Sequence, residues 1–416
     1  MAYIANVRIR LALLLQLLWV LFACGLSRAS DLALVGGKIY PSPTEPAIEN
    51  GSILLHEGRI VAVGSSATVK IPPDAKVIDC KGLVVTAGFW NSHVHILTPG
   101  LLHAEKLSSE QIASQLEEMF TRWGFTTVFD IASLLENTNL IRRRIANGEV
   151  KGPRILTVGE PFWTKAPIYV KDFLQTNHIS IPEVESPSQA AERVRQQIHD
   201  GADGIKIFTG SVQASSILIM PLDLANAIVG EAHRAGKPVF AHPGNQEAVE
   251  AALQSGVDIL AHTTPEGGPW PASLVARLKS AHIALIPTLT LWHVEFRGDS
   301  PAFEKGMNTT MLPQLRAYSE AGGQILFGTD VGYIEQYDTS EEFTWMSHAG
   351  MNFEQILASL TTNPAQRFGY SNRSGRIAKG MDADLAALSS DPAQDATAFS
   401  KVRCTIRGGK LIYSAR

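Results

Sequence analysis

The chain has 416 residues, of which 45% are apolar and 18% are charged, and its formal net charge at pH 7 is −4. This composition is typical of a large globular protein, and it excludes a disordered chain, a collagen-like chain and a disulfide scaffold. No long run of Lys or Arg is present, so the sequence lacks the concentrated basic face that binding to nucleic-acid phosphates requires. We therefore expect a small-molecule partner and no nucleic acid.

The first 29 residues have the character of a targeting segment. Two Arg residues precede an almost uninterrupted apolar stretch, residues 11–26, and no acidic residue occurs before Asp31. This pattern predicts a secretory signal peptide over residues 1–29, cleaved after Ala29, and therefore an exported protein that is periplasmic or secreted. Two alternatives stay open. The segment is an uncleaved membrane anchor, or the chain is lipidated at Cys24, since the residues ending there resemble a bacterial lipoprotein box.

The two remaining cysteines, Cys80 and Cys404, stand alone near opposite ends of the chain. Without a CxxC pair, the sequence excludes a thiolate zinc site. In an exported protein the two cysteines could form a disulfide, and the alternative is two buried free thiols.

Both ends of the mature chain have the pattern of short strands separated by Gly and Asn turns. Because these strands flank a segment of different character, they predict one discontinuous β domain, a small β-sandwich built from residues 30–88 and 369–416. The predicted strands are Leu32–Val35, Gly51–Leu55, Arg59–Val63 and Val77–Asp79 at the first end, and Asp384–Leu388 and Val402–Tyr413 at the second.

The middle of the chain, residues 89–368, alternates apolar strand-like runs with amphipathic helical stretches. Eight such runs predict an α/β fold of the (β/α)8 or TIM-barrel type. A doubly wound open sheet is the competing fold, but no GxGxxG turn follows the early strands. The predicted strands are Val84–Phe89, Thr126–Phe129, Arg154–Val158, Gly204–Phe208, Pro238–Ala241, Asp258–Ala261, Ala284–Pro287 and Ile325–Gly328. The predicted helices include Ser109–Trp123, Ser188–Asp200, Leu222–Ala235, Gln246–Ser255 and Ser340–Leu360.

Polar residues that can bind metal follow several of these runs. In a TIM barrel the catalytic groups lie at the carboxyl ends of the strands, so side chains that follow different strands converge. The first run leads into His93 and His95, and alternation along a strand would place these two on the same side about 6.6 Å apart at the backbone, where two imidazoles can share one metal ion. His242 follows the fifth run, His262 the sixth, and Asp330 the eighth.

Lys206 lies inside the fourth run, with Ile205 and Ile207 on either side. An ammonium group buried without a partner is costly, so this position needs an explanation. One interpretation is a lysine that reaches solvent or pairs with a neighbouring carboxylate. The other is a lysine that carbon dioxide has converted to a carbamate, whose two oxygens can bridge two divalent metal ions.

Together these residues resemble the motifs of the amidohydrolase superfamily, whose members are metal-dependent hydrolases with a (β/α)8 barrel and a small β-sandwich made from both termini. Within the superfamily the chain is most similar to the imidazolonepropionase-like and prolidase-like group, which includes secreted dipeptidases and amidases. The resemblance covers about residues 31–414. Its matching motifs are His93-Val94-His95, Lys206, His242, His262 and Gly328-Thr329-Asp330, with supporting stretches at residues 82–88 and 379–385.

The resemblance implies two divalent metal ions and a role for each matching residue. Zinc is the expected metal, because imidazole and carbamate ligands suit it. Asp330 would take a proton from the attacking hydroxide and pass it to the leaving amine. The buried ion would be held by His93, His95 and Asp330, the more exposed ion by His242 and His262, and carboxylated Lys206 would bridge the two.

The sequence departs from the pattern of this group in three places. Asn91 stands where many relatives have Asp, Thr263 stands where dipeptidase-like members have Gly, and residues 209–220 contain no clear Tyr or Arg to clamp a substrate carboxylate. Loops beyond the sixth to eighth strands carry residues that we predict to line the substrate pocket, with ordinary packing as the alternative. They are Trp270, Trp292, His293 and Tyr333.

The leading prediction is an exported metal-dependent amidohydrolase that cleaves a C–N bond of a small substrate such as an N-acyl amino acid or a dipeptide. The same metal pair could instead attack a lactone, an ester or a phosphoester. A mononuclear deaminase or cyclic amide hydrolase would bind one metal ion and would be indifferent to substitution of Lys206. A non-catalytic barrel that only binds its ligand would have lost at least one of the six metal ligands. Similar proteins are often homo-oligomers, and membrane attachment would involve only the N-terminal segment.

Overall fold

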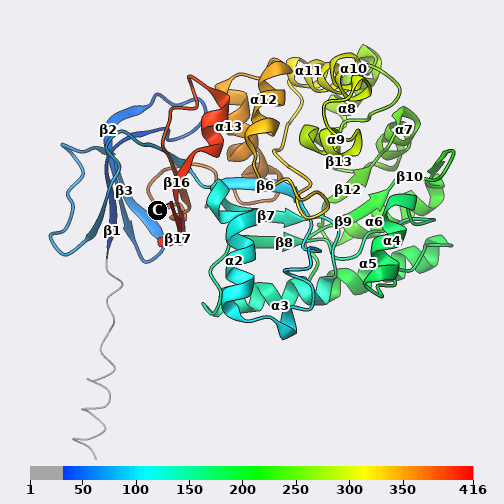
Figure 1. Cartoon of the computed structure of the whole chain (residues 1–416), viewed down its shortest axis with the longest axis horizontal. Helices are drawn as coiled ribbons and strands as arrows, with labels where there is room; N and C mark the ends of the chain where they lie inside the picture. Colours follow the sequence, from blue (N-terminus) through cyan, green and yellow to red (C-terminus); the bar gives the residue numbers. More distant parts are fainter. Residues whose placement is uncertain (1–30, 416) are drawn as a thin grey trace, which may run out of the picture.

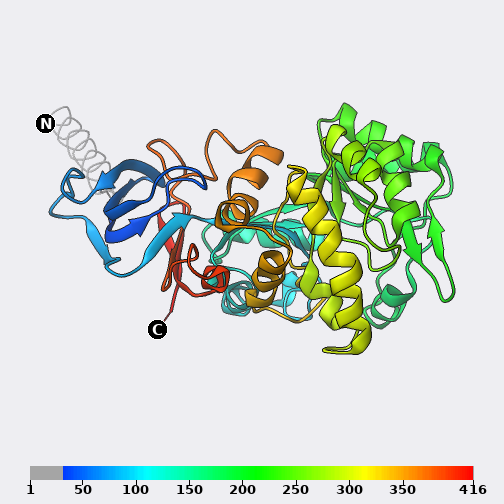
Figure 2. The ribbon, with the colours of Figure 1, turned by 90° about the horizontal axis from the view of Figure 1, so that it is seen from above.

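The structure, a computed structural model, describes residues 31–415. The predicted signal peptide and Cys24 lie outside these residues. The fold is mixed α/β: a sheet made from both ends of the chain lies at one end of the molecule, and parallel strands with helices around them form the larger part (Figures 1 and 2). Among the described residues, no helix is long and apolar enough to cross a membrane.

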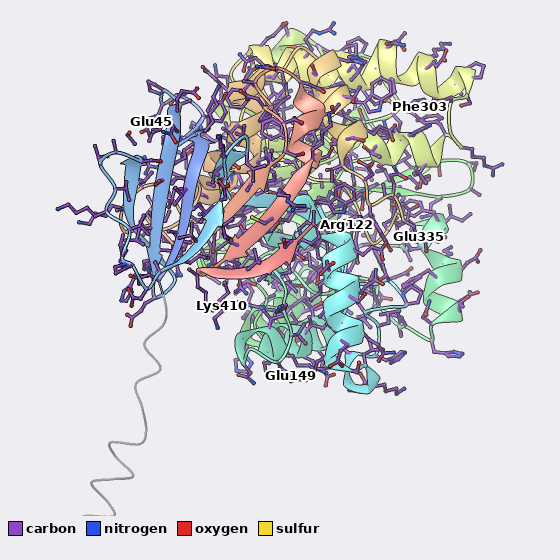
Figure 3. The ribbon with its side chains drawn as sticks, turned by 60° about the vertical axis from the view of Figure 1, so that its left-hand side comes forward. Glu45, Arg122, Glu149, Phe303, Glu335 and Lys410 are labelled. Atoms are coloured by element: carbon purple, nitrogen blue, oxygen red, sulfur yellow. The ribbon has the colours of Figure 1, made fainter. Side chains whose placement is uncertain are left out.

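The two ends of the chain form one connected eight-stranded sheet. Its strands follow the order β17-β16-β15-β5-β1-β2-β3, and β4 pairs with β1. The antiparallel pairing of β5 with β15, with Val85 opposite Ala387, joins the N-terminal segment to the C-terminal one, and blue and red strands lie side by side in Figure 3. The strands are β1 (Leu32–Ile39), β2 (Ile48–His56), β3 (Arg59–Ser65), β4 (Lys76–Asp79), β5 (Val84–Ala87), β15 (Leu385–Leu388), β16 (Val402–Arg407) and β17 (Lys410–Ser414).

Apolar side chains such as Leu34, Ile53 and Leu385 form a separate core for this sheet. Cys80 and Cys404 are buried in the same core as free thiols. Burial raises the pKa of Cys404 to about 11 and that of Cys80 to about 12, so both thiols stay protonated at neutral pH.

The predicted strand over residues 84–89 is two strands in different sheets. β5 ends at Ala87, and β6 begins at Phe89 in the parallel part of the fold. Gly88 lies between them, where a Cβ atom would come within 2.3 Å of the Thr126 side chain. The sequence prediction was wrong here because a continuous apolar run gives no sign of a change of sheet.

The larger part contains two parallel sheets, with strand orders β6-β7-β8 and β9-β12-β13-β14. The predicted strand Ile325–Gly328 is not a regular strand: Ile325 forms a single β-bridge, and the amide of Phe327 donates to the carbonyl of Ser359 on a helix instead of to a neighbouring strand. Single β-bridges join the sheet ends and this segment: Phe162 with Ile207, Leu285 with Ile325, and Val94 with Val331. The strands are β6 (Phe89–Val94), β7 (Phe125–Asp130), β8 (Arg154–Thr157), β9 (Ile205–Phe208), β12 (Val239–His242), β13 (Ile259–Ala261) and β14 (Ala284–Ile286), and β10 (Gly210–Val212) and β11 (Ile217–Ile219) form an unpredicted hairpin.

Helices surround the parallel strands (Figure 1). The predicted helix over residues 340–360 is two helices, because Gly350 has φ 92° and Asn352 caps the start of the second. The predicted helix over residues 109–123 ends at Met119 and is followed by a 3₁₀ turn. The helices are α2 (Ser109–Met119), α3 (Leu135–Ala146), α4 (Ile168–Thr176), α5 (Pro187–His199), α6 (Leu222–Arg234), α7 (Gln246–Ser255), α8 (Ala272–Ser280), α9 (Leu289–Glu295), α10 (Pro301–Gly306), α11 (Leu312–Glu320), α12 (Ser340–His348), α13 (Phe353–Leu360) and α14 (Thr362–Arg367). Single turns are η1 (Ala104–Lys106), η2 (Thr121–Trp123), η3 (Met307–Met311) and η4 (Ala396–Ser400).

Candidate metal centre

The six side chains predicted as metal ligands meet at the carboxyl ends of the parallel strands. They meet because these strands all run in one direction, so the residues that follow them lie at one face. All six line one cavity of about 710 Å³. They are His93 in β6, His95 just after it, Lys206 in β9, His242 at the end of β12, His262 just after β13, and Asp330 in the turn after residue 328.

The closest group surrounds the Asp330 carboxylate. Its Oδ1 lies 2.8 Å from His95 Nε2 and 3.2 Å from His93 Nε2, and its Oδ2 lies 3.7 Å from His262 Nε2. One ligand atom from each of His93, His262 and Asp330 lies within 4.8 Å of the others. Within residues 31–415, Asp330 Oδ1 is nevertheless buried without a hydrogen bond of good geometry. A carboxylate oxygen that faces imidazole nitrogens in this way fits a divalent ion such as zinc.

Contacts behind two of the rings orient them. His95 Nδ1 lies 2.8 Å from the carbonyl oxygen of Ala132, which can only accept, so Nδ1 carries a proton. The Nε2 atom of His95 is therefore the one that faces the centre. His262 Nδ1 lies 2.6 Å from Thr288 Oγ1 in a corresponding arrangement. Such outer contacts commonly orient metal-binding histidines.

Burial sets the charges of the centre. It lowers the pKa of His93 and of His242 to about 3 each, and that of His262 well below its ordinary value, so these rings are neutral. Burial alone would raise the pKa of Asp330, but His93 and His95 outweigh it and hold that pKa well below its usual range. Against the cost of burial, the close contact with the Asp330 carboxylate raises the pKa of His95. The neutral rings of His93, His242 and His262 and the ionised carboxylate of Asp330 are in the protonation states that bind metal.

Lys206 neither reaches solvent nor pairs with a carboxylate among the described residues, the two simple explanations that the sequence left open. Its side chain is 1% exposed, so it does not reach solvent. No carboxylate in residues 31–415 lies within ion-pair distance of its Nζ, which is 5.8 Å from the centre of the Phe208 ring. Burial lowers the pKa of the Lys206 amine to about 7, so a substantial fraction is neutral and nucleophilic at neutral pH.

Unusual backbone conformations turn two of the ligands. Asp330 has φ 62° and His262 has φ 97°, both positive values that non-glycine residues seldom adopt. Strain of this kind is concentrated at functional sites, where the surrounding contacts maintain it. Gly332 allows the chain to pass close to His95, since a Cβ atom at Gly332 would lie 1.8 Å from the His95 carbonyl oxygen.

Two residues that depart from the family pattern have clear contacts. Asn91 Oδ1 accepts the amide of His93 at 3.2 Å, and its Nδ2 donates to Thr329 Oγ1 at 2.8 Å. Asn91 therefore ties β6 to the turn that precedes the carboxylate ligand. Thr263 Oγ1 accepts the indole N–H of Trp292 at 3.0 Å, which holds that ring in the cavity wall.

Of the four residues predicted to line the substrate pocket, two line the cavity and two lie elsewhere. Trp292 and Tyr333 are part of the cavity wall. Trp270 is 4% exposed and packs in the core. His293 follows Trp292 on α9, and successive side chains of a helix point in directions about 100° apart. His293 therefore points away from the cavity wall, and its Nδ1 lies 2.7 Å from Glu341.

A second set of cavity residues escaped the sequence prediction. The segment between β8 and α5, residues 158–186, contributes Trp163, Tyr169 and Phe173 to the wall. Tyr169 Oη lies 3.4 Å from His242 Nε2, at the edge of the centre. The available signal was a long connection rich in aromatic residues, since connections of this length are often functional.

Known proteins resemble this chain over most of its length. The profile of the family described as the amidohydrolase family matches residues 84–412. An imidazolonepropionase of Thermoplasma acidophilum is 26% identical over 429 aligned residues, covering 94% of this chain and 96% of that protein. An ochratoxinase of Aspergillus niger is 22% identical, covering 91% of this chain and 86% of its own. The crystal structure of a Xaa-Pro dipeptidase with methionine bound in its active site has a TM-score of 0.78 at 23% identity, covering 93% of this chain and all (100%) of that one.

Proposed function

We propose that this chain, a member of the amidohydrolase family, cleaves the amide bond of a small substrate such as an N-acyl amino acid or a dipeptide. The chain belongs to the imidazolonepropionase-like and prolidase-like branch of the family and is a metal-dependent hydrolase of carbon–nitrogen bonds. The observation that carries this proposal is the buried Asp330 carboxylate facing three imidazole nitrogens at the wall of a large cavity. In the same proposal, residues 1–29 direct export, with lipidation at Cys24 as the alternative to cleavage after Ala29.

The proposal includes a closed fold around this centre. The single bridges between the two parallel sheets and residues 325–331 support a closed (β/α)8 barrel, because they connect each free sheet edge to the next. The terminal sheet, with its own apolar core, would be the small β-sandwich of the family.

The donor set fits two divalent ions, with zinc as the first choice because imidazoles dominate it. When bound, such ions lower the pKa of water and polarise a substrate carbonyl group. A carbamate on Lys206 is supported by the burial of this lysine and by its lack of a carboxylate partner among the described residues. His93, His95 and Asp330 would hold one ion and His242 and His262 the other, and a carbamate on Lys206 would be a further ligand.

Two side chains are placed to take part in amide cleavage. The ionised carboxylate of Asp330 can accept a proton from the attacking water and deliver it to the leaving amine. The hydroxyl of Tyr169, next to His242, can donate a hydrogen bond to the oxygen of the substrate carbonyl group as charge develops there.

Metal analysis by plasma mass spectrometry tests this assignment. The mature chain, purified with zinc and bicarbonate, should contain about two ions per molecule, as in other two-metal hydrolases. The Lys206→Met variant should lose one of them, whereas Lys151→Met, which changes an exposed lysine, should keep both. One ion in the unmodified chain would favour a mononuclear deaminase or cyclic amide hydrolase, and a metal-free protein would contradict the proposal.

The bond that is cleaved requires a separate assay. Release of a free amine from N-acyl amino acids and dipeptides should exceed the hydrolysis of lactones, esters and phosphoesters of similar size. A preference for the oxygen-linked substrates would replace the amide proposal by a different reaction at the same centre.

A further inference from the structure

The cavity wall carries two carboxylates besides that of Asp330. Glu266, in the loop after β13, and Glu295, at the end of α9, are both exposed at the cavity wall. Tyr333, which contacts Glu295, lines the same cavity, and we call Glu266, Glu295 and Tyr333 the acidic rim. Among the described residues that line the cavity, Lys206 in the centre is the only Lys or Arg. A substrate group that reaches the rim therefore meets carboxylates with no Lys or Arg beside them in the described cavity wall.

Contacts hold Glu295 in position relative to the centre. The hydroxyl of Tyr333 donates a hydrogen bond to Glu295 Oε1 at 2.7 Å. The centre of the Tyr333 ring lies 5.7 Å from that of Tyr169, which in turn lies 6.3 Å from that of His242. A chain of contacts through two aromatic rings thus links the Glu295 carboxylate to a proposed metal ligand of the same cavity.

Aromatic side chains make up much of the wall near the rim, including Trp292, Phe296, Tyr169 and Tyr333. The faces of aromatic rings attract cations, and the attraction adds to that of a neighbouring carboxylate. A substrate carboxylate is instead usually bound by Arg or Lys, and the rim has neither. The surroundings of the rim therefore suit an ammonium or guanidinium group.

Resting on the proposed hydrolase function, we propose that the acidic rim selects substrates by charge and that Glu295 is the specificity-determining residue. Amides that carry a positively charged group at the rim are cleaved in preference to neutral ones, and amides that present a carboxylate there are rejected. Among peptide-like substrates, this favours compounds with a basic side chain or a free amine over N-acyl amino acids whose only charge is a carboxylate.

Three amides that differ in one end group test this selection. The benzoyl amides of 1,5-diaminopentane, hexylamine and 6-aminohexanoate end in an ammonium, a methyl and a carboxylate group on the same chain of methylenes. With the full chain loaded with zinc, release of benzoate gives kcat/KM for each. We expect kcat/KM for the ammonium compound to be about tenfold higher than for the carboxylate compound. The partly exposed rim attracts the ammonium group and repels the carboxylate. The ratio should fall at high salt.

Variants locate the effect in the rim. Glu295→Gln removes the charge and keeps an acceptor for Tyr333, so the ratio of kcat/KM for the ammonium compound to kcat/KM for the carboxylate compound should fall about threefold. The matched control is Glu304→Gln, which removes an exposed carboxylate of α10 outside the cavity and should leave the ratio unchanged.

Failure of the rim proposal and failure of the hydrolase proposal give different results. If the methyl compound is cleaved and the carboxylate compound is cleaved as fast as the ammonium one, the rim proposal is wrong and the hydrolase proposal stands. If none of the three compounds is cleaved, their binding affinities test the rim proposal. These affinities are measured by quenching of the fluorescence of Trp163 and Trp292 in the cavity wall. Tighter binding of the ammonium compound that weakens in Glu295→Gln supports the rim proposal, and equal affinities overturn it.

Discussion

Tyr169 illustrates how a single residue acquires a role from its surroundings. It lies on α4, far in sequence from every proposed metal ligand, yet its hydroxyl is 3.4 Å from His242 Nε2. Burial raises the pKa of this hydroxyl well above its ordinary value, so it remains a hydrogen-bond donor throughout the physiological range.

If Tyr169 donates to the substrate carbonyl, Tyr169→Phe should lower kcat about a hundredfold, the loss measured when one such donor is removed from other enzymes. The fold and the metal content should not change, because the ring remains. Tyr413→Phe removes the same atom from β17 and serves as the control. Equal kcat values in the wild type and in Tyr169→Phe would show that the hydroxyl only packs in the wall.

At the scale of elements, α12 positions α9 through one buried carboxylate. Glu342 on α12 accepts hydrogen bonds from the amides of Leu289 and Thr290, at 2.9 Å and 2.8 Å, and from the hydroxyl of Thr290 at 2.9 Å. These bonds hold the first turn of α9, the helix that carries Trp292 and Glu295 to the cavity. Burial nevertheless raises the pKa of Glu342 from 4.5 to about 7.

The raised pKa of Glu342 predicts how stability depends on pH. A carboxyl group with a higher pKa in the folded state contributes stability that is full below pH 4.5 and is lost as the pH rises through about 7. Glu342→Gln does not titrate, so its free energy of unfolding should fall less over this interval than that of the wild type. Urea unfolding at several pH values measures the difference, with the exposed Glu354→Gln of α13 as control. Parallel pH profiles for wild type and Glu342→Gln would refute this account.

At the scale of the whole molecule, the metal centre joins segments that are distant in sequence. Its proposed ligands span residues 93 to 330 and come from strand ends in both parallel sheets and from the segment between them. Ions bound at this point would therefore link most of the larger part of the fold. A ligand that binds only the folded state stabilises that state, and the stabilisation grows with the logarithm of the ratio of ligand concentration to Kd.

Removal of metal should therefore destabilise the whole larger part of the fold. We expect a chelator to abolish hydrolysis and to lower Tm, and zinc at about a hundred times its Kd to restore about 2.7 kcal/mol. The Tm of the Asp330→Asn variant should respond to zinc much less, because the substitution replaces a charged ligand of the centre by a neutral one. Calorimetry with and without chelator makes the measurement, and a Tm that is indifferent to zinc would contradict a structural contribution of the ions.

The sequence predicted much of this arrangement because strand ends converge in any fold with parallel strands. His242 and His262 looked ordinary one at a time, and their position after apolar runs was what identified them. The same reasoning failed at Trp270 and His293, because a position after a strand does not determine which way a side chain points in a loop or helix. Tyr169 was missed because its helix lies within a long connection, and periodicity alone does not reveal that such a segment covers the cavity.

The amino-acid sequence by itself determined the order of most strands and helices, the family resemblance and the types of residue available for metal binding, because these depend on local pattern and motif spacing. Only the tertiary structure decided which groups share one place: the change of sheet at Gly88, the three imidazoles around Asp330, the lysine that lacks a carboxylate partner within residues 31–415, and the acidic rim of the cavity. The physical reason is that contacts between distant segments, burial and the charge of a cavity depend on packing in three dimensions, which local periodicity does not specify.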